Sequence, residues 1–293
     1  MNTFVVILFI ITLILLIYIS YMYSKTPSKP KKVIVFDMDE TLGSFVQLGI
    51  FIHILEEHIH RTVTSQEFNL FMDMFPLYQR PNIINILKYL KKEKQQGHCD
   101  KIYIYTNNQG PKSWALLIKQ YFEDKINYPL FDKVIHAYKV NNVQVEKHRT
   151  THNKTISDFF KCTKLSKYTN ICFLDDQYHH HMLHPNVYYL HLNEYKHLYD
   201  PNYMFDSFKQ SFDLSDTYIS YLKHNAESLY LDIDLYTNKH NTNKVYEKQI
   251  GSKMLHELKY FITSFNKPST RKIKHKQQYT RKNGHRYPYK HIH

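Results

Sequence analysis

Two aspartates that stand one residue apart follow an apolar run in the stretch VIVFDMDETLG, residues 33–43. Two later apolar runs also end in polar groups: KIYIY is followed by Thr106, and NICFL is followed by Asp175 and Asp176. Such runs predict buried strands. In an open α/β sheet, ligands bind at the carboxyl ends of the strands. We therefore expect these polar side chains to meet at one edge of a parallel sheet.

Four carboxylates in one place repel one another unless a cation shares the site. Mg²⁺ takes oxygen ligands from one or two carboxylates, from water and from a substrate phosphate. A carboxylate can also attack phosphorus and form an aspartyl phosphate, provided that a metal screens the charge of the phosphate. A second carboxylate can protonate the leaving alcohol and then deprotonate the attacking water. The hydroxyl of Thr106 and a lysine would hold the remaining phosphoryl oxygens.

These motifs resemble a known family. FDMDETL resembles motif I of the haloacid-dehalogenase-like superfamily, in the DxDxT form of its phosphatases. The resemblance is closest to the branch of the RNA polymerase C-terminal-domain phosphatases and the NLI-interacting-factor-like proteins, in which an Arg-Pro pair opens a helix before motif II. YQRPNIINIL (78–87) resembles that helix, IYIYTNN resembles motif II, and CFLDDQ resembles motif IV. The resemblance implies a Rossmann-like parallel sheet flanked by helices over residues 33–194.

The resemblance also implies roles for the acidic residues. Asp37 would be the nucleophile and a metal ligand. Asp39 would be the general acid and base, and would give the metal its backbone carbonyl. Asp175 would bind Mg²⁺ directly or through water, with Asp176 in support. Thr106 would be the hydroxyl of motif II.

Motif III requires a lysine, and KHRTTHNKTISDFF offers Lys147 and Lys154. In the family this lysine opens the helix that precedes the motif IV strand. We favour Lys154, because the segment from Thr155 onward has the pattern of that helix. The sequence departs from the branch where Met38 replaces a Leu, where motif IV reads DD instead of DN, and in the TNN after motif II.

The pattern along the chain predicts an α/β fold. Further strands are expected at 132–137 and 186–192, and helices at 81–94, 111–122, 154–162 and 250–265. Residues 44–80 form a connector too long for a plain loop, and a capping box of Thr64 and Glu67 favours a flap or a small helical cap. Residues 195–268 are predicted to be a helical extension. The histidines of YHHHMLHP (178–185) fit no common zinc spacing and are expected in a solvated loop at the mouth of the site.

The two ends of the chain carry the positive charge. The net charge is +13, yet residues 1–32 hold four lysines and no acid, and residues 269–293 hold eight Lys or Arg and no acid. The part between them has a net charge near zero, which argues against a nucleic-acid surface spread over the whole domain. The last 25 residues lack an apolar period and are predicted to be disordered. Contacts of this tail with anionic lipid, with nucleic acid, or with solvent alone all stay open.

Residues 4–23 form an uncharged run long enough to cross a membrane as a helix. A basic linker at 24–32 follows, and its lysines predict that the rest of the chain lies in the cytosol. Three widely spaced cysteines indicate no disulfide framework or metal motif. Some members of the family are tethered in this way near the endoplasmic reticulum and the nuclear envelope, and similar proteins occur in large DNA viruses.

The predicted function is that of a single-pass, membrane-anchored, Mg²⁺-dependent phosphatase for phosphomonoesters. The branch resemblance implies phosphoserine or phosphothreonine in a protein as the substrate. One alternative is a catalytically silent, membrane-tethered binding module of the same fold. A second alternative is a phosphatase for small molecules or nucleic-acid ends, which a large lid over the site would favour.

Overall fold

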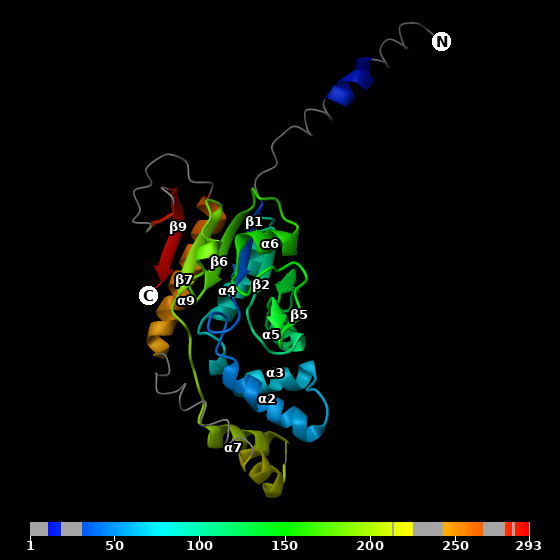
Figure 1. The fold of residues 1–293 in the computed structure, drawn as a ribbon, viewed down its shortest axis with the longest axis vertical. Helices are drawn as coiled ribbons and strands as arrows, with labels where there is room; N and C mark the ends of the chain where they lie inside the picture. The colour runs from blue at the N-terminus through cyan, green and yellow to red at the C-terminus, as the bar shows by residue number, and fades with distance from the viewer. Residues whose placement is uncertain are drawn as a thin grey trace, which may run out of the picture. The chain divides into compact units, whose positions relative to one another are not determined.

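A seven-stranded sheet in the order β3-β2-β1-β6-β7-β9-β8 organises residues 31–293 (Figure 1). The computed structural model describes residues 11–18, 31–212, 214–224, 243–265, 279–282 and 285–292. Neighbouring strands run parallel from β3 to β9, and only the pair of β8 and β9 is antiparallel. The strands are β1 (Lys32–Phe36), β2 (Lys101–Tyr105), β3 (Lys133–Ile135), β6 (Asn170–Asp175), β7 (Val187–Leu192), β8 (Tyr279–Lys282) and β9 (His285–Ile292). A separate hairpin consists of β4 (Lys139–Val140) and β5 (Val143–Gln144).

Helices cover both faces of this sheet, which confirms the predicted α/β class with a parallel sheet flanked by helices. Alternate residues of a strand point to opposite faces. In β1, Ile34 and Phe36 therefore join one buried cluster, while Val33 and Val35 join the other. The first cluster includes side chains of α4 (Ile83–Gln95), α5 (Lys112–Ile126) and α9 (Lys244–Ser264), and the second includes side chains of α6 (Ile156–Thr163). Burial on both faces explains why the strands read as continuous apolar runs.

The connector after β1 is a helical cap. It holds α2 (Val46–Ile59), α3 (Ser65–Met74) and the short helix η1 (Pro76–Tyr78). The predicted capping box is present: the Thr64 hydroxyl accepts from the Glu67 N–H at 3.2 Å, and the Glu67 carboxylate accepts from the Thr64 N–H at 2.8 Å. The ring of Phe51 packs against rings of α7 (Pro201–Phe212), so the C-terminal part of the chain supports the cap.

The C-terminal helix α9 packs onto the sheet domain. It contacts α4, and the side-chain amine of Lys32 donates to the backbone carbonyls of Phe261 and Ile262 in its last turn, at 3.0 and 2.7 Å. Lys32 is buried and begins β1. The prediction that the basic linker extends to Lys32 was therefore wrong at that residue. Its amine lies inside the fold, where it donates hydrogen bonds to carbonyls that have no partner within the helix.

The C-terminal tail also differs from its prediction. Residues predicted to be disordered form β8 and β9, and β9 extends the sheet by pairing in parallel with β7. The strand HRYPYKHI has His or Tyr at alternate positions with Arg, Pro, Lys and Ile between them, so its pattern lacks the usual apolar–polar signal of a strand.

The N-terminal 30 residues form a separate unit, in which the structure describes a helix at 11–18. Most of the predicted membrane segment 4–23 and of the linker 24–32 lies outside the described residues. Within the described parts of the chain, no helix has both the length and the apolar character needed to cross a membrane.

Candidate active site

The polar residues at the strand ends converge on one pocket of about 220 Å³. Asp37 and Asp39 follow β1, Thr106 follows β2, and Asp175 ends β6. β1 lies between β2 and β6, at the point where the chain reverses the direction in which it adds strands. Such a reversal is where open α/β sheets bind ligands. The pocket is lined by Asp37, Asp39, Glu40, Val46, Thr106, Asn107, Asn108, Lys154, Asp175 and Gln177.

A tight turn after β1 presents the two aspartates. The N–H of Glu40 donates to the carbonyl of Gly43 at 2.8 Å, and Glu40 has a φ of 54°. This left-handed backbone is uncommon for a residue with a side chain. Gly43 is required by close packing, since a Cβ there would lie 2.2 Å from the carbonyl oxygen of Tyr78.

Arg80, the arginine of the Arg-Pro pair, stabilises that turn through hydrogen bonds. Its guanidinium donates to the carbonyls of Glu40 and Asn193, each at 2.6 Å. It also forms an ion pair with Glu247 of α9 at 3.2 Å, with both side chains fully buried. Arg80 therefore connects the turn after β1 to the C-terminal helix.

Lys154 lies between two of the aspartates. Its amine forms ion pairs with Asp37 and, at 2.7 Å, with Asp175. Burial alone would lower the pKa of Lys154, but the two carboxylates outweigh that effect and raise it. Thr155 caps α6 by accepting from the N–H of Asp158, which places Lys154 directly before the helix, as the sequence predicted. Lys147, the alternative lysine, is exposed and does not line this pocket.

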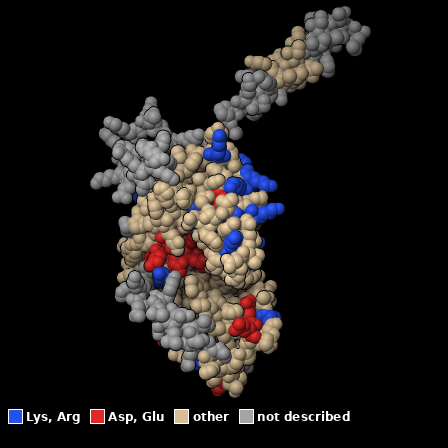
Figure 2. Space-filling model, in the orientation of Figure 1, with Lys and Arg blue, Asp and Glu red and all other residues tan. Residues whose placement is uncertain are grey.

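The carboxylates outnumber the positive charges around them. Burial, opposed by Lys154 and reinforced by the neighbouring aspartates, raises the pKa of Asp37 well above its ordinary value. Burial and the charge of Asp175 raise the pKa of Asp176 as well. For Asp175, burial is outweighed by Lys154 and His179, so its pKa is lowered. Figure 2 shows acidic side chains gathered in two areas of this face, the larger near its middle and the smaller lower in the view.

Three of these carboxylates are placed to hold a divalent cation. One oxygen each of Asp37, Asp175 and Asp176 lies within 4.8 Å of the others. Hard oxygen donors of this kind fit Mg²⁺. A cation there would offset the burial that raises the pKa of Asp37 and Asp176. The side chain of Asp39 does not belong to this group, which is compatible with the expectation that it offers a backbone carbonyl instead.

Asp39 has one oxygen engaged and one available. Its Oδ2 accepts from the side-chain amide of Asn108 at 2.9 Å, while its buried Oδ1 has no hydrogen-bond partner among the described residues. Burial raises its pKa from 3.8 to about 6, against the opposing effects of Asn108 and Lys154. A carboxyl group with such a pKa can donate and accept a proton near neutral pH.

Residues that sequence reasoning missed hold the loop after β2. The N–H of Asn108 donates to the Thr106 hydroxyl at 2.9 Å, so the hydroxyl hydrogen is free to point elsewhere. The buried guanidinium of Arg149 donates to the Thr106 carbonyl at 3.1 Å and to Asn107 Oδ1 at 2.8 Å. The TNN segment, which departs from the family branch, indicated that this loop is unusual. Nothing in the sequence indicated a role for Arg149, because it lies more than 40 residues away.

The histidine-rich loop mostly behaves as predicted. His180 and His181 are exposed, and His184 is half-buried. His179 is the exception, because its Nε2 lies 3.3 Å from Asp175 Oδ2. It therefore adds a polar contact to a candidate metal ligand.

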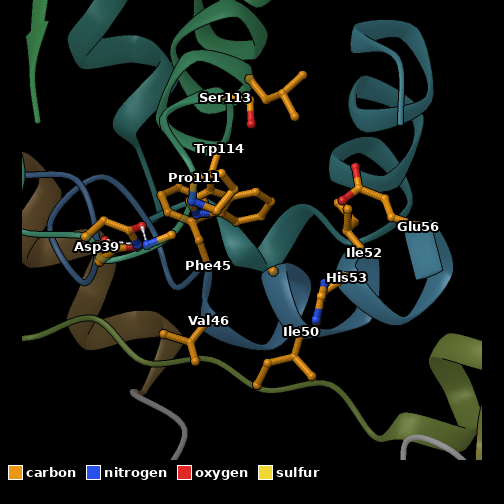
Figure 3. A pocket seen from close by; sticks show the side chains of 14 residues that line it. Asp39, Phe45, Val46, Ile50, Ile52, His53, Glu56, Pro111, Ser113 and Trp114 are labelled. Carbon is orange, nitrogen blue, oxygen red and sulfur yellow. Dashed lines mark hydrogen bonds between the residues drawn. The ribbon is translucent and has the colours of Figure 1, made fainter. Parts of the chain in front are cut away.

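A second pocket of about 340 Å³ adjoins the first and shares Asp39, Val46 and Asn108 with it. Figure 3 shows Phe45, Pro111 and Trp114 close together beside Asp39, with His53 and Glu56 farther away. Gly49 of α2 allows the indole of Trp114 to lie against the helix, since a Cβ there would already be 3.3 Å from the ring. The space beside the acidic site is thus mainly apolar and aromatic.

No family model matches the chain, and comparisons with curated proteins and with solved structures found no match either. Its chemistry must therefore be inferred from its own residues. The structure brings the predicted residues Asp37, Asp39, Thr106, Lys154 and Asp175 into one pocket, with Asp176 beside them.

Proposed function

We propose that the chain is a Mg²⁺-dependent phosphatase that hydrolyses phosphomonoesters through an aspartyl phosphate on Asp37. The observation that carries the proposal is the position of Lys154, just before α6, where its amine contacts both Asp37, which is 117 residues away, and Asp175, which is 21 residues away. Lys154 gives these buried carboxylates a counter-charge, and it stands at the position where the family resemblance expects the lysine of motif III. The motif resemblance and the geometry of the pocket agree on the same residues.

In the proposed reaction, Asp37 attacks phosphorus while the bond from phosphorus to the leaving oxygen breaks. The free Oδ1 of Asp39 is suited to carry the proton that passes to the leaving alkoxide. Water then attacks the phosphorus of the aspartyl phosphate, Asp39 takes the proton of that water, and the carboxylate of Asp37 is released together with inorganic phosphate. The Thr106 hydroxyl and the Lys154 amine supply donors for the phosphoryl oxygens.

Asp37, Asp175 and Asp176 would hold the cation. A bound Mg²⁺ would neutralise charge on the phosphoryl group and on the nucleophile. Lys154 keeps the carboxylates of Asp37 and Asp175 in position through its two ion pairs.

We further propose phosphoserine or phosphothreonine in a protein as the substrate, which rests on the branch resemblance. The apolar pocket beside Asp39 supports a substrate that carries an apolar group near its phosphoester. We also propose that residues 4–23 anchor the enzyme in a membrane with its catalytic part in the cytosol, on the basis of the apolar run and the lysines that follow it.

The direct test is a phosphatase assay of the full chain in detergent, with Mg²⁺ and with a chelator. We expect turnover of an aryl phosphate that requires the cation. Asp37→Asn should reduce turnover to background, because the amide keeps the shape but loses the nucleophile. Asp206→Asn, at a side chain 70% exposed on α7, serves as the matched control. Full turnover by Asp37→Asn, or in the absence of divalent cation, would contradict the proposal and favour the binding-module alternative or a different chemistry.

A further inference from the structure

We infer that Tyr289 of the C-terminal strand β9, acting through His191 of β7, positions the loop that presents Asp175 and Asp176 to the cation. The inference rests on the proposed function, since it assigns a role in the same metal site. It assigns strand β9 a role in that site, although the resemblance to a phosphatase family ends at residue 194.

Side chains of β7 fix the backbone of the loop after β6. Nε2 of His191 lies 2.9 Å from the carbonyl oxygen of Asp176. The hydroxyl of Tyr189 donates to the carbonyl of Gln177 at 2.6 Å and accepts from the N–H of His179 at 2.8 Å. Three backbone groups within four residues are thus held from the neighbouring strand. This loop carries the candidate metal ligand Asp176 and directly follows Asp175 at the end of β6, so its position affects where the oxygens of both residues lie.

The direction of the His191 hydrogen bonds follows from the chemistry of its partners. A carbonyl oxygen can only accept, so Nε2 of His191 carries the hydrogen. In a neutral imidazole that carries its hydrogen on Nε2, Nδ1 is an acceptor. Nδ1 lies 2.8 Å from the hydroxyl of Tyr289, which must therefore donate to it. Tyr289 selects the imidazole tautomer that can bond to Asp176, as second partners of histidines commonly do.

The position of Tyr289 is set by the pairing of β9. Tyr289 pairs with Tyr189, and His291 pairs with His191, in the parallel register. The ring centroids of Tyr189 and Tyr289 are 5.5 Å apart, and those of His191 and His291 are 4.4 Å apart. Both β7 residues that hold the loop are therefore packed against β9.

Loss of the Tyr289 hydroxyl removes one of the two contacts that favour the Nε2–H tautomer of His191, so the Nδ1–H tautomer becomes more accessible. The Nδ1–H tautomer turns a lone pair on Nε2 toward the carbonyl of Asp176, which repels it. Partners that bond directly to metal ligands typically change metal affinity 10- to 100-fold when they are removed. Tyr289 acts one hydrogen bond farther out, so we expect Tyr289→Phe to weaken cation binding by about three- to tenfold.

The test measures Mn²⁺ binding to the full chain in detergent, by electron paramagnetic resonance, for the wild type and Tyr289→Phe. Tyr178→Phe is the matched control, because its ring packs on Tyr289 at 5.7 Å and its side chain is 46% exposed. We expect a Kd about three- to tenfold higher for Tyr289→Phe and an unchanged Kd for the control. Nitrogen-15 spectra should show His191 as the Nε2–H tautomer in the wild type and as a mixture in Tyr289→Phe.

A second pair of variants keeps the test decisive if Tyr289→Phe does not fold. His191→Gln retains an N–H donor that can reach the Asp176 carbonyl and should keep most of the affinity, whereas His191→Leu should lose it. A wild-type Kd for Tyr289→Phe, or equal Kd values for the two His191 variants, overturns the inference and leaves the proposed function intact. A wild type that binds no Mn²⁺ instead contradicts the metal site of the proposed function itself.

Discussion

Replacement of Asp39 by Asn should lower activity and raise stability at the same time. The amide has the shape of the carboxyl group, and its oxygen can still accept the 2.9 Å hydrogen bond from Asn108. The other oxygen of Asp39 is buried without a partner among the described residues, so the replacement removes no further hydrogen bond there. What it does remove is the proton donor and base of the proposed reaction.

The two magnitudes follow from separate physical effects. General acid–base catalysis contributes typically 10²- to 10⁴-fold, so the barrier for an alkyl phosphate should rise by about 3–5 kcal/mol. Burial raises the pKa of Asp39 from 3.8 to about 6. A raised carboxyl pKa means that the folded state binds the proton more tightly, so stability falls as pH rises from about 4 to 6 and stays lower above that. Removal of this charge at pH 7, without divalent cation, should stabilise the fold by up to about 3 kcal/mol.

The assay compares an alkyl phosphate with an aryl phosphate, in parallel with urea unfolding at pH 7. An aryl leaving group needs little protonation, so Asp39→Asn should form the phosphoenzyme from it and then hydrolyse it slowly, which allows the intermediate to be trapped. Asp206→Asn removes only an exposed ion pair with Lys223, so it should leave activity unchanged and lower stability by no more than about 1 kcal/mol. Alkyl phosphate turnover within about threefold of the wild type would refute the acid–base role, because the expected loss is at least 10²-fold. A less stable variant would refute the reasoning from burial.

Two further predictions concern the framework of the site. Arg80→Met should destabilise the fold by about 3–5 kcal/mol, because it leaves Glu247 buried without its partner and removes the hydrogen bonds to the carbonyls of Glu40 and Asn193. Addition of Glu247→Met should recover, in urea unfolding, only the part of that loss that comes from the unpaired Glu247; equal instability of the single and double variants would contradict this reasoning. The hydrogen bonds of Glu67 with Arg61 and Thr64 lower its pKa to about 2. The stability that Glu67 contributes is therefore complete above its ordinary pKa of 4.5 and is lost as the pH falls from there toward 2. The unfolding free energy of Glu67→Gln should therefore converge with that of the wild type in acid, and a difference independent of pH would rule out the ion pair and the capping box as its cause.

The strands and the polar residues at their ends could be predicted from the sequence. Burial on both faces gives each central strand a short apolar run, and parallel strands bring their carboxyl ends to one edge of the sheet. That logic predicts from the sequence alone that Asp37, Thr106 and Asp175 lie together. Lys154 could be favoured over Lys147 because the motif III lysine of the family opens the helix before the motif IV strand, and the segment from Thr155 onward has the pattern of that helix.

The supports of the site could not be read from the sequence in the same way. The partner of Arg80 is Glu247, and the residue that donates to His191 is Tyr289, each separated from its partner by about a hundred residues or more. Local patterns report which face of an element is apolar, but a polar contact between distant segments leaves no period in either of them. For the same reason Lys32 was assigned to a linker and β9 to a disordered tail.

The α/β class, the strand ends and the candidate reacting groups can thus be predicted from the chain alone, because they depend on local hydrophobic pattern and on the alternation of residues along strands. How those groups are held depends on contacts between distant segments. α9 and β9 pack back onto the sheet domain. Arg80, Arg149 and Tyr289 hold their positions because buried polar groups must find hydrogen-bond partners, and the fold supplies these partners from distant parts of the sequence.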